Sequence, residues 1–354
     1  MLMADKLRNL LLLWACVLLL ITQSADASCS SPLLHGFNFL QDSQTALDSP
    51  KVCQSLQKLH RTGANSVAFI PFMKQESPQT TNLFLADNVS DAELIAGIRE
   101  AKRQGLHVVV KPQLLVSGSW AGRIKLAIDA DEQIWFKQYI AHLAHYARIA
   151  ETSKVDAFVV GTEMKRLRKS KYWLDVIKAI RRHFSGHITY AAHGVDGVIA
   201  FPYWDLLDSV GVTLYPVFPE KADAGQVREV ITQRINKLGE AIRKQKGKTA
   251  WILEIGIPSA EGWERYPWDW RKLREEKPRA DNQMQIVIMQ EWLMSMDRPW
   301  IEGVWIWKWK SSPQAGGVED PGYTVQNKPA QGVIQAAWQC ATSIPDHGQD
   351  LCKD

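Results

Sequence analysis

Two glutamates in this chain end runs of apolar residues. Glu163 follows the apolar stretch 157–162, and Glu254 follows the stretch 250–253. A carboxylate at the end of an apolar strand is costly to bury unless it is paired, hydrogen-bonded or protonated. Either glutamate alone could have a structural role, in which its carboxylate bonds to a neighbouring Lys or Arg. Together they suit glycoside hydrolysis, because one carboxyl must protonate the leaving oxygen while the other attacks or activates water.

Polar side chains also follow other apolar runs. The phenol of Tyr215 would donate a hydrogen bond to Glu254 and keep that carboxylate oriented and ionised. Lys111 and Gln113 would bind sugar hydroxyls, and the charge of Lys111 would also favour an ionised carboxylate in the site. His193 is a further candidate for substrate binding. Each has a structural alternative: a buried tyrosine, a lysine that extends to solvent, or a histidine that only supports the scaffold.

Tryptophan is the unusual feature of the composition. The chain has 15 Trp against 8 Tyr and 10 Phe, and nine of the Trp lie between Trp251 and Trp309. Strand alternation predicts Trp305, Trp307 and Trp309 on one side of the last apolar run, where the earlier rings would fill the interior. We expect Trp307 to form the floor of a sugar subsite, with Trp305 as the alternative. The aromatic segment 259–281 either walls the same cleft or packs back on outer helices.

The elements that must position these residues form a repeating pattern of apolar, β-prone runs and segments of helical period. The expected strands are 35–40, 65–71, 107–111, 156–160, 187–192, 209–214, 249–255 and 303–307. The clearest helical segments are 91–104, 131–150, 173–183, 224–244 and 282–295. Continuous apolar strands alternating with helices are typical of a parallel sheet covered by helices.

Eight such repeats with no second zone of composition predict an α/β fold consisting of a single (β/α)8 TIM barrel. An open doubly wound sheet is the alternative, but the first apolar run lacks the glycine-rich phosphate loop that would favour it. Active-site groups in a TIM barrel lie where the strands end. Glu163 and Glu254, on the fourth and seventh runs, would therefore face one another across the barrel mouth.

Five short stretches carry a resemblance to a known family. They are 66–72 (SVAFIPF), 110–113 (VKPQ), 161–164 (GTEM), 204–208 (WDLLD) and 326–330 (QNKPA). In order and spacing they resemble glycoside hydrolase family 113, whose known members are β-mannanases, within the large clan of retaining TIM-barrel glycosidases. The resemblance implies that Glu163 is the acid/base, that Glu254 is the nucleophile, and that the reaction retains the anomeric configuration. Many members of the wider clan have Asn before the acid/base to bind the sugar 2-hydroxyl. Here either Thr162 or another residue takes that role.

The first 27 residues have the order of a secretory signal peptide. A basic start and an apolar run over 10–21 precede a small-residue A-x-A site that ends at Ala27. We expect cleavage of 1–27, leaving 28–354 as an exported catalytic domain that is periplasmic or secreted; an uncleaved anchor is the alternative. Four cysteines would remain, compatible with two disulfides in any of three pairings. They are Cys29, Cys53, Cys340 and Cys352.

Composition excludes several classes of protein. Hydrophobic residues make up 46% of the chain and charged residues 23%, which is a globular balance. The net charge of +4 is spread along the chain, so we expect no nucleic-acid partner. Motifs of metalloproteases, P-loops and serine hydrolases are missing from the sequence, so we expect no metal and no cofactor.

We therefore expect an exported, monomeric glycoside hydrolase that has no stable membrane insertion after signal cleavage. Its partner would be a β-linked polysaccharide or oligosaccharide, with β-mannan as the first choice. One alternative keeps the scaffold and changes the substrate to a β-glucan or an exopolysaccharide. The other is a glycan-binding barrel without catalysis.

Overall fold

The computed structural model describes residues 34–339 and Cys352, in which eight parallel strands close into a barrel. The strands are β1 (Leu34–Leu40), β2 (Ser66–Phe69), β5 (His107–Val110), β7 (Ala157–Thr162), β8 (His187–His193), β9 (Val210–Leu214), β10 (Ala250–Ile255) and β11 (Ile301–Lys310). They follow one another around the barrel in chain order, and β11 pairs with β1 to close it. The predicted (β/α)8 barrel is confirmed, and each expected strand is present.

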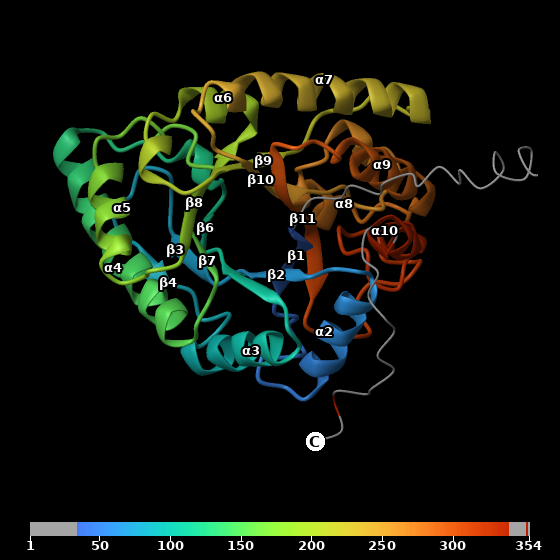
Figure 1. Ribbon diagram of the computed structural model, residues 1–354, viewed down its shortest axis with the longest axis horizontal. Coiled ribbons are helices and arrows are strands. Elements are labelled where there is room, and N and C mark those ends of the chain that lie inside the picture. The colour runs from blue at the N-terminus through green and yellow to red at the C-terminus, as the bar shows by residue number, and fades with distance from the viewer. Residues whose placement is uncertain (1–33, 340–351, 353–354) are drawn as a thin grey trace, which may run out of the picture. The chain divides into compact units, whose positions relative to one another are not determined.

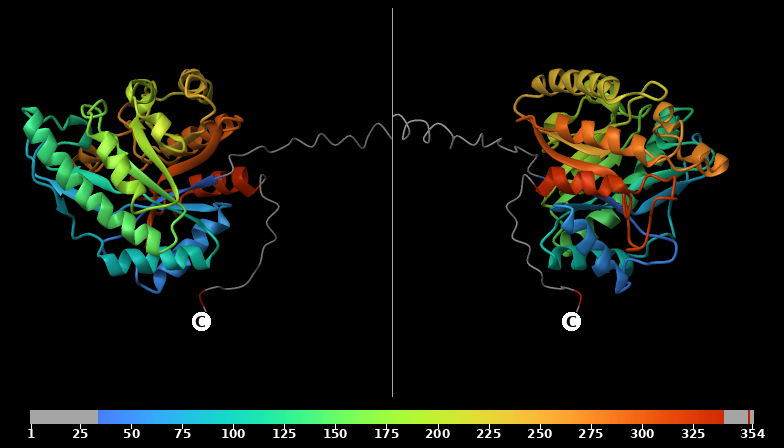
Figure 2. Two further views of the ribbon diagram at one scale, coloured as in Figure 1. Left: turned by 60° about the vertical axis from the view of Figure 1, so that its left-hand side comes forward. Right: turned by 90° about the vertical axis from the view of Figure 1, so that its right-hand side faces the viewer.

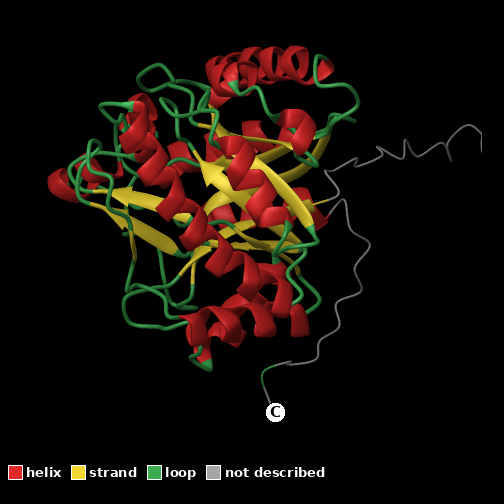
Figure 3. Cartoon of the chain, turned by 90° about the vertical axis from the view of Figure 1, so that its left-hand side faces the viewer, coloured by secondary structure: helices red, strands yellow, loops and turns green. Residues whose placement is uncertain are grey.

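Helices connect the strands and surround them (Figure 1). The α-helices are α2 (Lys51–Arg61), α3 (Asp91–Arg103), α4 (Asp129–Thr152), α5 (Trp173–Arg181), α6 (Gly194–Ala200), α7 (Ala224–Arg243), α8 (Trp270–Glu276), α9 (Asn282–Ser295) and α10 (Pro329–Gln339). The 3₁₀ helices are η1 (Ala121–Arg123), η2 (Trp204–Leu206) and η3 (Trp263–Arg265). The side views show helices lying along the strands (Figure 2, Figure 3). Ser90 and Asp223 form capping boxes that fix where α3 and α7 begin.

Apolar side chains fill the space on both faces of the strands. Those that point into the barrel include small residues such as Ala68, Ala157 and Ala191, which leave room for Trp251 and Trp305. Larger side chains fill the outer layer between strands and helices. Because both faces are buried, the strands read as unbroken apolar runs, which is why the sequence predicted them.

Three barrel strands carry an extra residue near their C-terminal ends. The pairing of β7 with β8 shifts between Val159 and Thr162, and that of β10 with β9 shifts between Ile252 and Glu254. The third shift lies in β11, after Ile306. Bulges of this kind change the direction of a side chain and are frequent beside active sites. Here they lie on the two strands that present the glutamates and on the strand that presents the tryptophans.

The bulge in β11 corrects one prediction. Phe37 of β1 pairs with Ile306 and Phe39 with Trp309, so two residues of β11 oppose one residue of β1. The extra residue reverses the alternation, and Trp309 lies in the outer layer rather than beside Trp305 and Trp307. Its ring packs 4.8 Å from that of Phe37, centroid to centroid. Trp309 is therefore part of the core between the barrel and its helices.

A second small sheet, which the sequence did not predict, follows the second and third barrel strands. It consists of β3 (Phe72–Gln75), β4 (Phe84–Leu85) and β6 (Gln113–Val116). β3 pairs in parallel with β6 and antiparallel with β4. The sheet extends the barrel on one side and holds Gln113 close to the end of β5.

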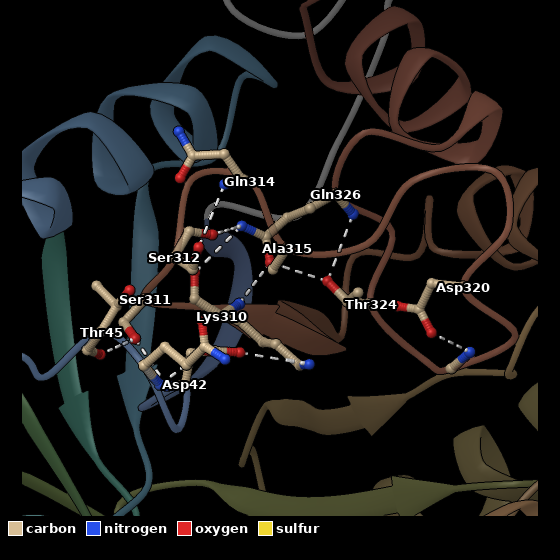
Figure 4. A network of polar contacts seen from close by, with 12 residues as sticks. Asp42, Thr45, Lys310, Ser311, Ser312, Gln314, Ala315, Asp320, Thr324 and Gln326 are labelled. Carbon is tan, nitrogen blue, oxygen red and sulfur yellow. Dashed lines mark hydrogen bonds and ion pairs between the residues drawn. The ribbon is translucent and has the colours of Figure 1, made fainter.

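Polar contacts fix the seam between β1 and β11 at the barrel mouth (Figure 4). The Asp42 N–H donates to the Ser311 hydroxyl at 2.7 Å, and the Lys310 N–H donates to Gln326 Oε1 at 2.6 Å. The Gln326 amide also donates to the carbonyls of Lys310 and Ser312, both at 3.1 Å. Gln326, which belongs to one of the family-like stretches, therefore has a structural role in closing the barrel.

The predicted signal segment 1–27 lies outside the described residues, as do Cys29 and Cys340. Cys53 of α2 forms a disulfide with Cys352, which is one of the pairings that the sequence left open. Within the part of the chain that is described, no helix combines the length and the apolar character needed to cross a bilayer.

Candidate active site

Glu254 lies near the end of β10 and accepts three hydrogen bonds. Lys111 Nζ and Gln113 Nε2 donate to its Oε1 at 2.6 and 2.7 Å, and the Tyr215 hydroxyl donates to its Oε2 at 2.7 Å. The Glu254 side chain is 7% exposed. The Tyr215 contact is the one expected from the sequence. Lys111 and Gln113 were expected to bind sugar hydroxyls, but here they donate hydrogen bonds to the Glu254 carboxylate. Three donors on a buried carboxylate stabilise its negative charge.

Lys111 is completely buried beneath Glu254. Besides Glu254, its Nζ donates to Asn38 Oδ1 at 2.6 Å, and Asn38 Nδ2 donates to the Leu253 carbonyl at 3.0 Å. Burial lowers the pKa of Lys111, and the charge of Glu254 opposes that change. Asn38 thus orients the lysine, a role that sequence reasoning missed. Its one signal was an amide between two phenylalanines inside the run 35–40.

The two glutamates interact electrostatically. Burial is the largest influence on the pKa of Glu254 and raises it above the ordinary value. The positive charge of Lys111 opposes that rise, and the negative charge of Glu163 adds to it. Lys111 acts on both carboxyls, because its charge also contributes to the pKa of Glu163. The sequence-predicted pair therefore shares one site.

Glu163 follows β7 with a left-handed backbone (φ 56°), which is uncommon for a residue with a side chain. Its N–H donates to the Ala191 carbonyl at 2.8 Å, which holds this conformation at the end of the strand. The side chain is 23% exposed and therefore more open to solvent than Glu254. Left-handed residues of this kind cost roughly 1–2 kcal/mol and gather at functional sites.

His193 and Thr213 hold the Glu163 carboxylate. His193 Nδ1 lies 3.0 Å from Glu163 Oε1, and the Thr213 hydroxyl donates to the same oxygen. Burial raises the pKa of Glu163, but the hydrogen bond and charge of His193, together with Thr213, outweigh burial and leave the pKa below its ordinary value. The His193 ring also lies 4.8 Å from that of Trp120, between centroids. His193 was expected to bind substrate, but here it contacts the Glu163 carboxylate. Sequence reasoning missed Thr213 and Trp120, and a hydroxyl within the apolar strand β9 was the signal for Thr213.

Thr162 ends β7 immediately before Glu163 and is 7% exposed. Its hydroxyl oxygen is buried and has no hydrogen-bond partner among the described residues. A buried hydroxyl normally has a partner. Thr162 therefore stays one of the two alternatives expected from the sequence for binding the sugar 2-hydroxyl, with its oxygen buried in this structure.

The two predicted tryptophans occupy different environments. Trp307 is half-buried, and its ring centroid lies 5.5 Å from Lys111 Nζ and 5.6 Å from Lys308 Nζ. Trp305 is fully buried against Trp251 inside the barrel, and it donates to the Ser66 hydroxyl at 3.0 Å. Trp305 therefore fills the core and leaves Trp307 as the ring that can contact a sugar.

Segment 259–281 lies against this site. Its residues Ala260, Trp263 and Leu273 form a buried cluster with Tyr323, and Tyr215, Tyr266 and Trp307 pack against that cluster. The Arg271 guanidinium donates to the carbonyl of Val116 in β6 at 3.2 Å. These contacts favour the cleft-wall interpretation of the segment over the one in which it packs on outer helices. Within the described residues, no group of three His, Cys, Asp or Glu side chains is placed to hold a metal ion.

A closed (β/α)8 barrel with two interacting glutamates at the ends of its fourth and seventh strands defines a TIM-barrel glycoside hydrolase. The family model for Glycoside Hydrolase Family 113 matches residues 36–328. The chain belongs to this family and is a β-mannanase-like glycoside hydrolase. No curated protein sequence matches the chain.

Solved structures agree with that assignment. A complex of a family 113 β-1,4-mannanase is 27% identical, covers 86% of this chain and 98% of its own, and has a TM-score of 0.74. A second family 113 β-1,4-mannanase structure is also 27% identical, covers 87% and 99%, and has a TM-score of 0.76. The family 113 β-mannanase of Alicyclobacillus acidocaldarius, in complex with ManMIm, is 23% identical, covers 89% and 100%, and has a TM-score of 0.76.

Proposed function

We propose that this protein hydrolyses β-mannan by a double displacement in which Glu254 is the nucleophile and Glu163 is the acid/base. The observation that carries the assignment of roles is the difference between the two carboxyls. Glu254 is nearly buried and accepts from Lys111, Gln113 and Tyr215, which suits an ionised nucleophile held in one orientation. Glu163 is more exposed and can reach a leaving oxygen.

In the first step the Glu254 carboxylate attacks the anomeric carbon and the bond to the leaving oxygen breaks. Glu163 gives its proton to that oxygen, and a glycosyl ester with Glu254 remains. In the second step water attacks the anomeric carbon, Glu163 takes a proton from the water, and the bond to Glu254 breaks. Two inversions leave the anomeric configuration as it was.

The first step needs a protonated Glu163, whereas His193 and Thr213 lower the pKa of that residue. A sugar chain would cover the exposed part of the Glu163 side chain. Burial is already the largest influence on this pKa, and it raises it. Substrate binding therefore shifts Glu163 toward the protonated form, while Glu254 keeps its three donors.

Mannan is the substrate favoured by the similar structures, which are described as β-mannanases. The test is product analysis on a panel of β-mannans and β-glucans, in which the anomer formed first is identified by NMR. We expect hydrolysis of β-mannan with a β-anomer as first product. Cleavage of glucan alone would support the alternative substrate. Binding without turnover of any glycan would support the non-catalytic alternative.

We also propose that the protein is exported and that residues 1–27 are its signal peptide. The Cys53–Cys352 disulfide supports this proposal, because such bonds persist in oxidising compartments. The mature chain would begin at Ser28, and N-terminal sequencing of the purified protein checks this directly. An N-terminus upstream of Ser28 would favour the uncleaved anchor.

Replacing Tyr215 with Phe is expected to shift the pH dependence of activity. The hydroxyl of Tyr215 lowers the pKa of Glu254. Its loss raises that pKa further. In the free enzyme the pKa of Glu254 lies above its ordinary value and that of Glu163 lies below, so the basic limb of the kcat/KM profile, which follows the higher of the two pKa values, moves to higher pH. We also expect kcat to fall by about tenfold or more, since a hydrogen bond to a charged group contributes roughly 1.5–3 kcal/mol.

Tyr323→Phe is the matched control for this experiment. Tyr323 lies in the same aromatic cluster, but its hydroxyl donates to the Pro267 carbonyl at 2.9 Å. The basic limb of the Tyr323→Phe profile should coincide with that of the wild type. Equal shifts in both variants, or none in Tyr215→Phe, would contradict the role given to Tyr215.

A further inference from the structure

The segment that directly follows Glu163 is strongly basic. Five of the seven residues from 165 to 171 are Lys or Arg. They are Lys165, Arg166, Arg168, Lys169 and Lys171. Although the net charge of the chain is only +4 and is spread over its length, this cluster closely follows the predicted acid/base in the sequence.

The segment is fixed at its apolar positions. The Met164 N–H donates to the Tyr190 hydroxyl at 3.1 Å, and Met164 is buried. Leu167 is also buried, and its carbonyl accepts from Trp173 Nε1 at 2.9 Å. The Lys165 N–H donates to the carbonyl of Glu163 at 2.7 Å. The basic side chains are thus presented from an anchored backbone next to Glu163.

Four of the five cations form no ion pair among the described residues, and three of these four are exposed. Lys171 pairs with Asp129 at 3.1 Å. Among the described residues, no ion pair is formed by the other exposed cations of the segment, which are Lys165, Arg166 and Lys169.

Asp196 does not neutralise this group. The Lys165 charge contributes to lowering the pKa of Asp196, but Asp196 already pairs with Lys237 at 2.8 Å. Exposed like charges repel one another, so they contribute nothing to folding that neutral polar residues would not. A cluster of uncompensated cations beside a cleft attracts negatively charged ligands.

We propose that Lys165, Arg166 and Lys169 bind negatively charged groups, such as uronate carboxylates, on the leaving-group side of the substrate chain. A general acid must contact the oxygen that joins the two sugars, so the departing part of the chain lies next to Glu163 and to this segment. The inference rests on the proposed role of Glu163. It narrows the substrate class from a neutral β-mannan to a β-mannan that carries acidic groups.

The test compares two substrates that have the same backbone, one of which also carries negative charge. One is a neutral β-mannan, and the other is the same mannan with a fraction of its primary hydroxyl groups oxidised to carboxylates. We expect the wild type to have a higher kcat/KM on the oxidised mannan, by roughly tenfold at low salt, and this preference should shrink in 0.5 M NaCl, about three times the physiological ionic strength. In the triple variant Lys165→Gln, Arg166→Gln, Lys169→Gln the ratio of the two kcat/KM values should fall toward one.

The matched control is Arg243→Gln, Lys244→Gln, Lys246→Gln. These exposed cations lie at and just beyond the end of α7, before β10 begins, and therefore at the barrel end opposite the active site. This variant should keep the wild-type ratio. A ratio near one in the wild type, or an unchanged ratio in the segment variant, would overturn the inference, as would segment-dependent binding only to phosphatidylglycerol vesicles.

Failure of the proposed function would look different. If neither mannan is hydrolysed, catalysis on mannan fails, and calorimetric binding of the two polymers by the Glu254→Gln variant still measures the charge preference. Stronger binding of the oxidised polymer that depends on Lys165, Arg166 and Lys169 would then support the segment's role. Equal binding would reject it.

Discussion

Replacing Glu254 with Ala is expected to lower kcat/KM on β-mannan by roughly 10⁴-fold or more, because the variant has no group that can form the glycosyl ester. Sodium azide should restore turnover. The anion fits the space left by the carboxylate and attacks the anomeric carbon from that side. Because the reaction then stops after one displacement, the product is a glycosyl azide of inverted configuration, which NMR identifies.

A control variant separates chemistry from folding in the Glu254 variant. Glu291 is a buried glutamate of α9 that pairs with Arg228 at 2.8 Å, outside the active site. Glu291→Gln should keep wild-type activity at temperatures where it is folded. If Glu254→Ala retained activity without azide, or if azide gave a product of retained configuration, Glu254 would not be the nucleophile.

The environment of Lys111 makes the choice of substitution important. With Ala at 254, the buried ammonium keeps Asn38 and the Leu253 carbonyl but loses its carboxylate. Leaving one member of a buried ion pair without its partner typically costs about 3–5 kcal/mol. Glu254→Gln keeps an oxygen that Lys111 can donate to, so it should unfold at a higher temperature than Glu254→Ala while being equally inactive in hydrolysis.

Much of the fold could be predicted because a TIM barrel repeats one local rule. Each strand is buried on both faces, so it reads as an apolar run, and a polar residue that ends the run is a candidate for the mouth. This rule placed Glu163, Glu254 and Tyr215 together. It also placed Lys111 at the site, but it could not tell whether the lysine bonds a sugar or the carboxylate.

The features that were missed depend on contacts between strands that are distant in sequence. The bulge in β11 becomes visible when the strand is paired with β1, so strand alternation alone put Trp309 on the wrong face. Asn38 and Thr213 lie inside apolar strands, where a single polar residue is a signal that does not reveal its partner. Their roles follow from the neighbours that the barrel gives them, Lys111 and Glu163.

Replacing Glu163 with Ala should give a second, different pattern of loss. General acid–base catalysis contributes about 10²- to 10⁴-fold, so hydrolysis of mannan should fall by that amount. An aryl β-mannoside with a nitrophenolate leaving group needs no proton to depart. On that substrate the variant should therefore release nitrophenol in a rapid burst and then turn over slowly, because water no longer has a base.

Azide distinguishes the two glutamates, because it reacts in a different step in each variant. In Glu254→Ala it replaces the nucleophile in the first displacement. In Glu163→Ala the glycosyl ester with Glu254 still forms, and azide replaces water in the second step without needing a base. Two displacements then occur, and the glycosyl azide has retained configuration, the opposite of that expected from Glu254→Ala. If both variants gave the same azide anomer, the two carboxyls could not have the separate roles that the donors of Glu254 and the exposure of Glu163 assign to them.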